Sequence, residues 1–278
     1  MQRRLLTPRH VCVVCLWALL LASGLRLHGE EPAPAAGSAF NAYAGAVEAR
    51  LVRQHARPSS ILASVSAADH QRLHRGEPVI EQVTEPLSPQ APNLDPPGGL
   101  LRHWRGTAFV PAARAADLEH LLRDYDAYPQ RFAPQVHSAK VLALDNDHYQ
   151  ALIRVRQQHI LTVVLDSTYD VAFTRLDSSR RYSISRSQSI REIDSAGSVH
   201  EHALNGQEQH GFLWRLNTYW SYEERDGGLY MQIESISLSR SIPAGLGWML
   251  RPFVESIPRE SLEFTLSCAT NALRKPAN

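Results

Sequence analysis

The chain is poor in cysteine. Among 278 residues it has three, and two of them, Cys12 and Cys15, lie in an N-terminal segment that we expect to be removed. The third, Cys268, lies in an apolar stretch near the other end, where a lone thiol behaves as a small hydrophobic side chain. A framework of disulfides is therefore excluded, and no catalytic role is expected for Cys268.

Long hydrophobic runs are also scarce. The longest uncharged run, residues 11–25, has about 15 residues, whereas a membrane-spanning helix needs about 20. Arginines precede this run and small residues follow it at 33–36, which is the order found in a secretory signal peptide. We expect residues 1–29 to be a signal peptide, with a membrane anchor as the alternative. The mature protein is then exported, either to the periplasm or out of the cell.

The chain has no large excess of charge. It carries 29 basic and 28 acidic residues, and without residues 1–29, which hold four arginines, 25 basic residues face 28 acidic ones. Proteins that bind nucleic acid rely on a strong basic surface. No nucleic-acid partner is therefore expected.

Thirteen histidines are present, but the patterns typical of metal sites are missing. His70 and His74 have helical spacing, and His200, His202 and His210 fall in a polar stretch. Neither group has a nearby second cysteine or the glutamate of a zinc hydrolase helix, which favours solvated histidines. The chain also lacks a nucleophile elbow, a phosphate-binding glycine loop and a dinucleotide fingerprint. We expect no metal, no cofactor and no catalytic residues, and an enzyme is the less favoured class.

Residues 30–99 are expected to form an N-terminal extension. Apolar spacing predicts a helix at 39–55 and a short helical turn at 66–73. Alternation predicts a strand at 77–84, and the prolines that follow predict a loop at 85–99. We expect the first helix to pack against, or cap, the rest of the protein.

Residues 100–278 are expected to form one domain. A strand at 100–111 precedes two helical segments at 112–125 and 127–132. Six further strands are predicted at 139–145, 148–158, 160–175, 182–193, 211–225 and 229–240. Short polar breaks separate them, as in Asp226-Gly227-Gly228, so the sheet should be an antiparallel meander. A final helix is predicted from about 259 to 275, with Pro258 at its N-terminus.

Residues 122–134 carry the motif Leu-Arg-Asp-Tyr-Asp-Ala-Tyr-Pro-Gln-Arg-Phe-Ala-Pro. Together with the order of elements over residues 100–274, it resembles the START-like superfamily, also called SRPBCC, and in particular its polyketide cyclase/dehydrase-like and coenzyme Q-binding members. The resemblance implies an α+β helix-grip fold, in which a curved antiparallel sheet wraps around a long C-terminal helix. It also implies a cavity for lipids, sterols, quinones, hormones or polyketides. Some members transport or sense such molecules, and a minority catalyse.

Aromatic residues in the predicted strand at 211–225 are candidates for ligand contact, because wide rings line apolar pockets while their polar atoms orient a ligand. Alternation places Trp214, Trp220 and Tyr222 on one face and Tyr219 on the other. Only one face can meet the cavity. Ordinary core packing of half of these rings is an equally favoured alternative.

The strand at 148–158 contributes Tyr149, Ile153 and Val155, which alternation places on one apolar, inward face. Arg154 and Arg156 then point outward into solvent. If either arginine pointed inward instead, it would need a carboxylate partner.

Glu234 is the candidate for such a partner and would mark the site of a ligand head group. Trp248 and Phe253 are further candidates, because they should lie between sheet and terminal helix. The complete predicted ligand site is Tyr149, Ile153, Val155, Trp214, Tyr219, Trp220, Tyr222, Glu234, Trp248 and Phe253.

From these features we expect an exported protein that binds a small hydrophobic ligand, such as a lipid, quinone or sterol-like molecule, without altering it. Transient contact with a membrane is a further expectation. The first alternative is a cyclase-like or hydrolase-like enzyme that uses the same cavity. The second is an interaction module, in which Trp248, Met249 and Phe253 fill the space under the terminal helix.

Overall fold

The computed structural model describes residues 31–57, 59–84, 96–158, 162–241 and 247–274, with the backbone alone for residues 247–255. The expected signal peptide and most of the proline-rich loop lie outside the described residues. None of the described helices combines the length and the apolar character needed to cross a membrane.

The N-terminal elements confirm the predicted helix, helical turn and strand. Helix α2 (Pro34–His55) begins before the predicted start, because Pro34 occupies the first turn, where proline is tolerated. Helix α3 (Ala67–His74) is capped by Ser66, whose hydroxyl accepts the N–H of Asp69 at 3.0 Å. Strand β1 (Val79–Gln82) follows.

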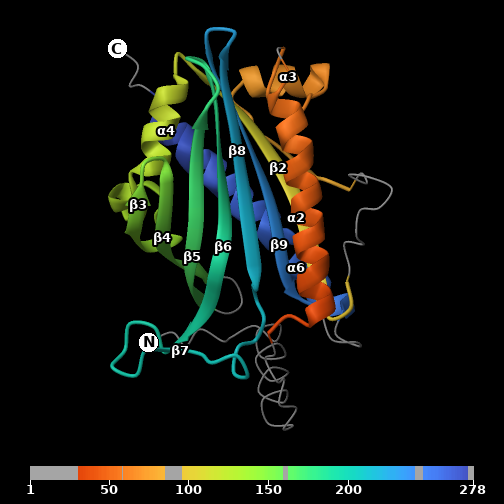
Figure 1. Ribbon diagram of the computed structural model, residues 1–278, viewed down its shortest axis with the longest axis vertical. Helices are drawn as coiled ribbons and strands as arrows, with labels where there is room; N and C mark the ends of the chain where they lie inside the picture. The colour runs from red at the N-terminus through yellow and green to blue at the C-terminus, as the bar shows by residue number, and fades with distance from the viewer. Residues whose placement is uncertain (1–30, 58, 85–95, 159–161, 242–246, 275–278) are drawn as a thin grey trace, which may run out of the picture.

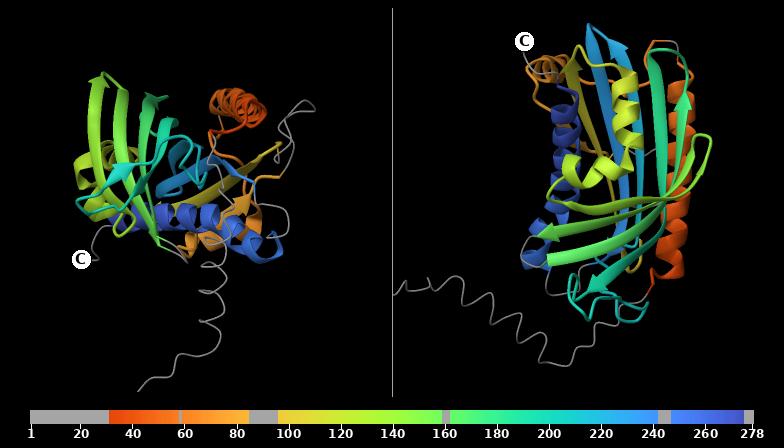
Figure 2. Two further views of the ribbon diagram at one scale, coloured as in Figure 1. Left: turned by 90° about the horizontal axis from the view of Figure 1, so that it is seen from below. Right: turned by 90° about the vertical axis from the view of Figure 1, so that its left-hand side faces the viewer.

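The strands form one antiparallel sheet in the order β1-β2-β9-β8-β6-β5-β4-β3, with β7 paired to β6 off this path. The remaining strands are β2 (Gly99–Pro111), β3 (Val136–Asp145), β4 (His148–Gln158), β5 (Thr162–Arg175), β6 (Arg180–Asp194), β7 (His202–Ala203), β8 (Arg215–Arg225) and β9 (Gly228–Arg240). Two-residue turns join β3 to β4 and β8 to β9. The predicted meander is confirmed, and the sheet is visibly curved (Figure 2).

The helices that follow β2 are α4 (Ala115–Arg123), the 3-10 turn η1 (Tyr125–Ala127) and α5 (Tyr128–Arg131). The last helix, α6 (Gly247–Leu273), is longer than predicted. The assignment of Pro258 to its N-terminus was wrong, because the helix runs through this residue. An interior proline costs a helix about 3 kcal/mol. Burial of Leu262, Leu266 and Ala269 along α6 supplies the compensating packing.

The sheet has two covered faces. We call the face toward α4 and α6 the inner face and the face toward α2 the outer face. Figures 1 and 2 show α2 and α6 on opposite sides of the central strands. The inner core joins α4 and α6 to the sheet, and its larger members are Val110, Leu118, Leu122, Tyr169, Val171, Phe173, Trp220, Tyr222, Leu229, Met231, Ile233, Leu262 and Leu266.

The outer core lies under α2. Phe40, Tyr43, Val47 and Leu51 recur at helical spacing on one side of this helix and are buried. They pack against sheet residues of the outer face, namely Leu101, Trp214, Tyr219, Ile236 and Leu238. The predicted packing role of this helix is confirmed, and the central strands are buried on both faces.

Gly106 of β2 packs against Leu262 and Leu266 of α6, and it offers a test of this packing. A Cβ atom there would collide with Leu266 and lie 2.9 Å from Cδ1 of Ile80. We expect Gly106→Ala to lower the free energy of unfolding by about 1–3 kcal/mol. Gly45→Ala, on an open side of α2, should raise it by about 0.5–1 kcal/mol. Urea denaturation measures both, and equal effects of the two substitutions would contradict the packing described.

Candidate functional site

Four predicted site residues lie on or beside the inner core. Trp220 and Tyr222 of β8 are buried members of it. Tyr149 and Ile153 of β4 are partly buried and pack against it. The structure thus brings these four side chains to the same side of the sheet, facing α4 and α6.

Trp214 and Tyr219 lie on the other side, in the outer core under α2. The prediction that Trp214 shares a face with Trp220 and Tyr222 was therefore wrong. Strand β8 begins only at Arg215, and Gly211 turns the chain with a positive φ of 77°. Alternation holds within an extended strand, so it could not be extrapolated back to residue 214.

Glu234 also faces α2. It is 2% exposed, and its carboxylate accepts hydrogen bonds from His103 Nε2 at 2.9 Å, from Arg105 Nε at 3.1 Å and from Arg50 of α2. Burial alone would raise the pKa of Glu234. The hydrogen bond from His103 and the charges of Arg105 and Arg50 outweigh it and lower the pKa to about 2.

His103 links Glu234 to α2 a second time. Its Nδ1 atom lies 3.1 Å from the hydroxyl of Tyr43. Burial lowers the pKa of His103, so the ring is neutral, and burial raises the pKa of Tyr43 to about 12. The tautomer that satisfies both contacts donates from Nε2 to Glu234 and accepts at Nδ1 from Tyr43. This closed network fastens α2 to β2 and β9 and lies on the opposite side of the sheet from α6.

The arginines of β4 have the predicted orientation. Arg154 forms a two-pronged ion pair with Asp166 at 2.6 and 2.8 Å and contacts Glu201 at 2.6 Å. Arg156 is exposed. Neither residue contacts Glu234 within the described part of the chain, so the head-group pair considered for an inward arginine does not form.

The inner face is closed at one end and open at the other. Beside the C-terminal half of α6, Val110, Tyr222, Leu229 and Met231 have no exposed surface. Toward the other end of the sheet, side chains from three strands keep partial exposure: Trp104, Ile153, Val155 and Leu216. Three of them, Trp104, Ile153 and Leu216, pack against the inner core. The inner face therefore keeps partly exposed apolar surface at this end.

Among the buried polar atoms without a hydrogen-bond partner in the described residues, Nε1 of Trp104 and the hydroxyl of Tyr222 lie on the inner face, together with Nε of Arg123 and Arg181. Burial raises the pKa of Tyr222, with the charge of Glu119 adding to the effect, so its hydroxyl stays protonated. Both the indole and the phenol can donate a hydrogen bond. Buried donors normally find partners, and a carbonyl or hydroxyl oxygen of a ligand would satisfy them.

A buried ion pair lies beside Tyr222. Arg181 of β6 is the strand partner of Tyr222, and its guanidinium donates to Glu119 of α4 at 2.7 Å. Both charged side chains are about nine-tenths buried. Because each charge is already neutralised by the other, the pair sets the polarity of this end of the inner face without offering a free charge.

Sequence reasoning missed Trp104 and Leu216. Both could have been found by alternation, because they share faces with the inner residues Ala108 and Trp220. Trp248 and Phe253 fall in α6, but their side chains lie outside the described residues.

The strand order and the position of α6 define the helix-grip fold that the resemblance to START-like proteins predicted. No protein-family model and no curated protein matches the sequence. Solved structures with a similar arrangement include a START superfamily protein from Mycobacterium smegmatis, with 16% identity and a TM-score of 0.40 over 62% of this chain and 96% of that one.

Two further structures show a similar arrangement. A STAR-related lipid transfer protein from Xanthomonas axonopodis has 17% identity and a TM-score of 0.42, over 65% of this chain and 96% of that one. The Zhui aromatase/cyclase from Streptomyces sp. R1128 has 17% identity and a TM-score of 0.41, over 62% of this chain and 93% of that one.

Proposed function

We propose that this protein is an exported carrier that binds a small hydrophobic molecule between the inner face of its sheet and α6. The lipid, quinone and sterol-like classes fit the proposal. The observation that supports it is the partial exposure of Trp104, Ile153, Val155 and Leu216 on an inner face whose other end is closed. An apolar ligand that covered these side chains would gain about 25 cal/mol for each Å² removed from water.

Orientation of the ligand would come from two of the unpartnered donors of the inner face. The hydroxyl of Tyr222 lies at the closed end, while Trp104 belongs to the open end. A ligand with an oxygen at or near its leading end could accept from Tyr222. Its apolar body would then lie along Ile153 and Leu216.

Export is the second part of the proposal and rests on the sequence of residues 1–29. Outside the cytoplasm, a hydrophobic molecule that moves between membranes needs a carrier, and transient membrane contact would load and unload it. N-terminal sequencing of the protein recovered from its native compartment tests this part. A mature chain that still begins at Met1 in the cytoplasm would overturn it.

Binding can be tested with a fluorescent hydrophobic probe and a pair of matched variants. Ile153→Asp places a charge on the open apolar surface, and we expect it to weaken probe binding at least tenfold. Leu152→Asp changes the next residue of β4, which is also partly exposed but points to the other face. It should leave the probe affinity within about twofold of the wild type.

Equal loss of binding in the two variants, with both folded by circular dichroism, would place the probe elsewhere and contradict the proposed site. If the aspartate at 153 prevents folding, Ile153→Ser and Leu152→Ser make the same comparison with a smaller perturbation. A wild-type protein that binds no probe and releases no lipid would overturn the proposed function.

A cyclase-type enzyme is the second candidate, because an unpartnered Tyr222 hydroxyl lies beside the Glu119–Arg181 pair. A neutral phenol can polarise a carbonyl by donating a hydrogen bond. Tyr222→Phe separates the candidates once a ligand is known. In a carrier the substitution lowers affinity and the ligand is recovered unchanged, whereas in an enzyme it also removes conversion of the ligand.

A further inference from the structure

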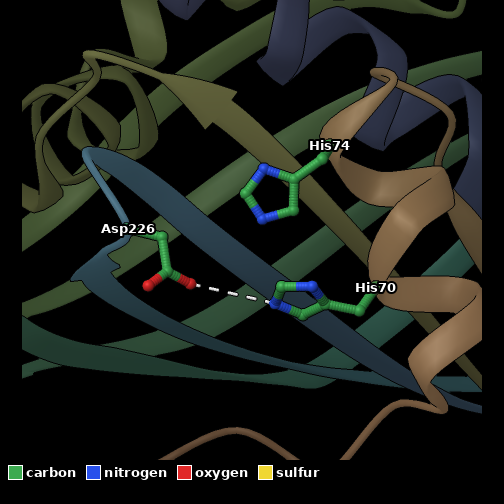
Figure 3. Close-up of side chains that lie close together, drawn as sticks. All are labelled: His70, His74 and Asp226. Carbon is green, nitrogen blue, oxygen red and sulfur yellow. Dashed lines mark ion pairs between the residues drawn. The ribbon is translucent and has the colours of Figure 1, made fainter.

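Three potential metal-binding side chains meet where α3 covers the β8–β9 hairpin. His70 and His74 lie one turn apart on α3, and Asp226 lies in the hairpin turn (Figure 3). One donor atom from each falls within 4.8 Å of the others. His70 Nε2 and Asp226 Oδ2 are 3.8 Å apart. Within the described residues this is the group that could hold a metal ion.

The hydroxyl of Tyr230 lies at the point where these three side chains converge. It is 2.8 Å from Nε2 of His70, 2.8 Å from Nε2 of His74 and 2.9 Å from Oδ2 of Asp226. A phenol has one proton, which it donates to Asp226, so it accepts from both imidazoles. Four donor atoms thus point at one small region of space.

We propose that His70, His74, Asp226 and Tyr230 bind one divalent transition-metal ion of the zinc class. Two imidazoles, a carboxylate and a phenol oxygen, with no thiolate, are donors that suit Zn²⁺. With bonds of about 2.0–2.1 Å, the donors of a tetrahedral zinc site lie about 3.3 Å apart. The 3.8 Å between His70 and Asp226 is close to that spacing. To admit the ion, Tyr230 moves outward, and the donors of His70, His74 and Asp226, which lie within 4.8 Å of one another, draw closer together.

The local structure prepares these ligands in two ways. Asp226 has a positive φ of 55°, a conformation that aspartate and asparagine adopt more readily than most residues, and the tight hairpin fixes its direction. Helical spacing of four residues puts the two histidines on the same side of α3. The side chains of His70 and Asp226 are 40% and 44% exposed, so an ion can enter without unfolding of the chain.

Arg225 is the charged group that opposes a cation here. Its Nε lies 3.4 Å from Asp226, and its guanidinium stacks over the ring of Tyr230 at 4.6 Å. The same side chain donates to Glu223 at a shorter distance of 2.7 Å. A metal ion would replace the long contact with Asp226, while the short ion pair with Glu223 keeps the arginine charge balanced.

A hollow of about 310 Å³ adjoins the cluster, and His70, Tyr230 and Arg225 contribute to its wall. It offers a path for the ion and room for a water molecule bound to it. Coordination would release the proton of Tyr230 to solvent, and both imidazoles would carry their single proton on Nδ1, which leaves the Nε2 lone pair for the ion. The site joins α3 to the hairpin, so metal binding should stabilise the fold.

Calorimetric titration of the untagged, chelator-treated full chain with ZnCl2 tests this proposal. We expect one Zn²⁺ per chain and the difference absorbance of a tyrosinate. At free zinc about a hundred times the Kd, the Tm should rise by roughly 5–10 °C. Asp226→Asn keeps the backbone conformation and an acceptor for Tyr230 but removes the charged ligand. It should weaken zinc binding at least tenfold and change the metal-free Tm little.

The matched control is His120→Gln, which removes an exposed histidine of α4 far from the cluster along the chain. It should bind zinc as the wild type does. The proposal is overturned if the wild type takes up no zinc, or if Asp226→Asn binds zinc with unchanged affinity and tyrosine absorbance. His70→Gln serves as a second ligand variant if the asparagine protein does not fold, and it should show the same loss of affinity.

Discussion

Replacement of Glu234 by alanine is expected to lower the free energy of unfolding by about 3–5 kcal/mol. The substitution leaves Arg50 and Arg105 without their shared buried partner, and it removes the acceptor of the fully buried His103. Each of these groups loses water on folding, so each needs the carboxylate. Urea denaturation followed by circular dichroism measures the loss.

Glu81→Ala is the matched control. Glu81 also pairs with Arg105, at 3.0 Å, but its side chain is 49% exposed, so its removal should cost less than about 1 kcal/mol. Equal losses in the two variants would contradict the account of the buried network. Because Glu234 lies on the outer face, a folded Glu234→Gln protein should bind the hydrophobic probe as the wild type does. Loss of probe binding in the Glu234→Gln protein would contradict this placement and show that Glu234 belongs to the ligand site.

The packing of α2 should weaken as the solution becomes acidic. Burial, helped by the charge of Arg50, lowers the pKa of His55 from 6.5 to about 4. His55 lies near the end of α2, 2.8 Å from the hydroxyl of Ser221 and against the ring of Tyr182. Above pH 6.5 the ring is neutral in the folded and the unfolded chain. Between pH 6.5 and 4 only the unfolded chain takes up the proton, so stability falls.

The loss from His55 over this interval should approach about 3 kcal/mol. Glu234 continues the trend at lower pH, because its pKa falls from 4.5 to about 2 on folding. Between these values only the unfolded carboxylate is protonated. The stability that Glu234 contributes is therefore complete above pH 4.5 and is lost as the pH falls toward 2.

His55→Gln separates the two contributions, since glutamine can keep the contact with Ser221 but does not titrate. The variant should show a flatter dependence of unfolding free energy on pH between 6.5 and 4 and the wild-type dependence below 4. Identical curves for variant and wild type across the whole range would show that His55 does not titrate as described.

Much of the fold could be predicted from local patterns. The strand at 148–158 was found at its true boundaries because Asn146-Asp147 marks a turn, and Asp226-Gly227 marks the β8–β9 turn in the same way. These signals are local and depend on backbone conformation. The start of α6 was missed because the preference of proline for the first turn of a helix is weaker than the packing that holds Leu262 and Leu266 against the sheet.

The faces of the sheet were harder to predict, because α2 covers the side that would otherwise be solvated. Strand β9 is buried on both faces and therefore lacks the alternation that marks an inner face. Glu234 is the clearest case. Its partners Arg50 and His103 are 184 and 131 residues away, so the sequence around it carries no sign of them. The grouping of His70 and His74 with Asp226 was hidden by the same kind of separation.

The carrier account is tested most directly by native mass spectrometry of the full protein purified from its own compartment, followed by organic extraction. We predict a bound lipid, quinone or sterol-like molecule in near-stoichiometric amount, released unchanged and absent from the Ile153→Asp protein. A wild-type protein that is recovered empty and takes up no hydrophobic probe would contradict the account and favour an interaction module with a filled core.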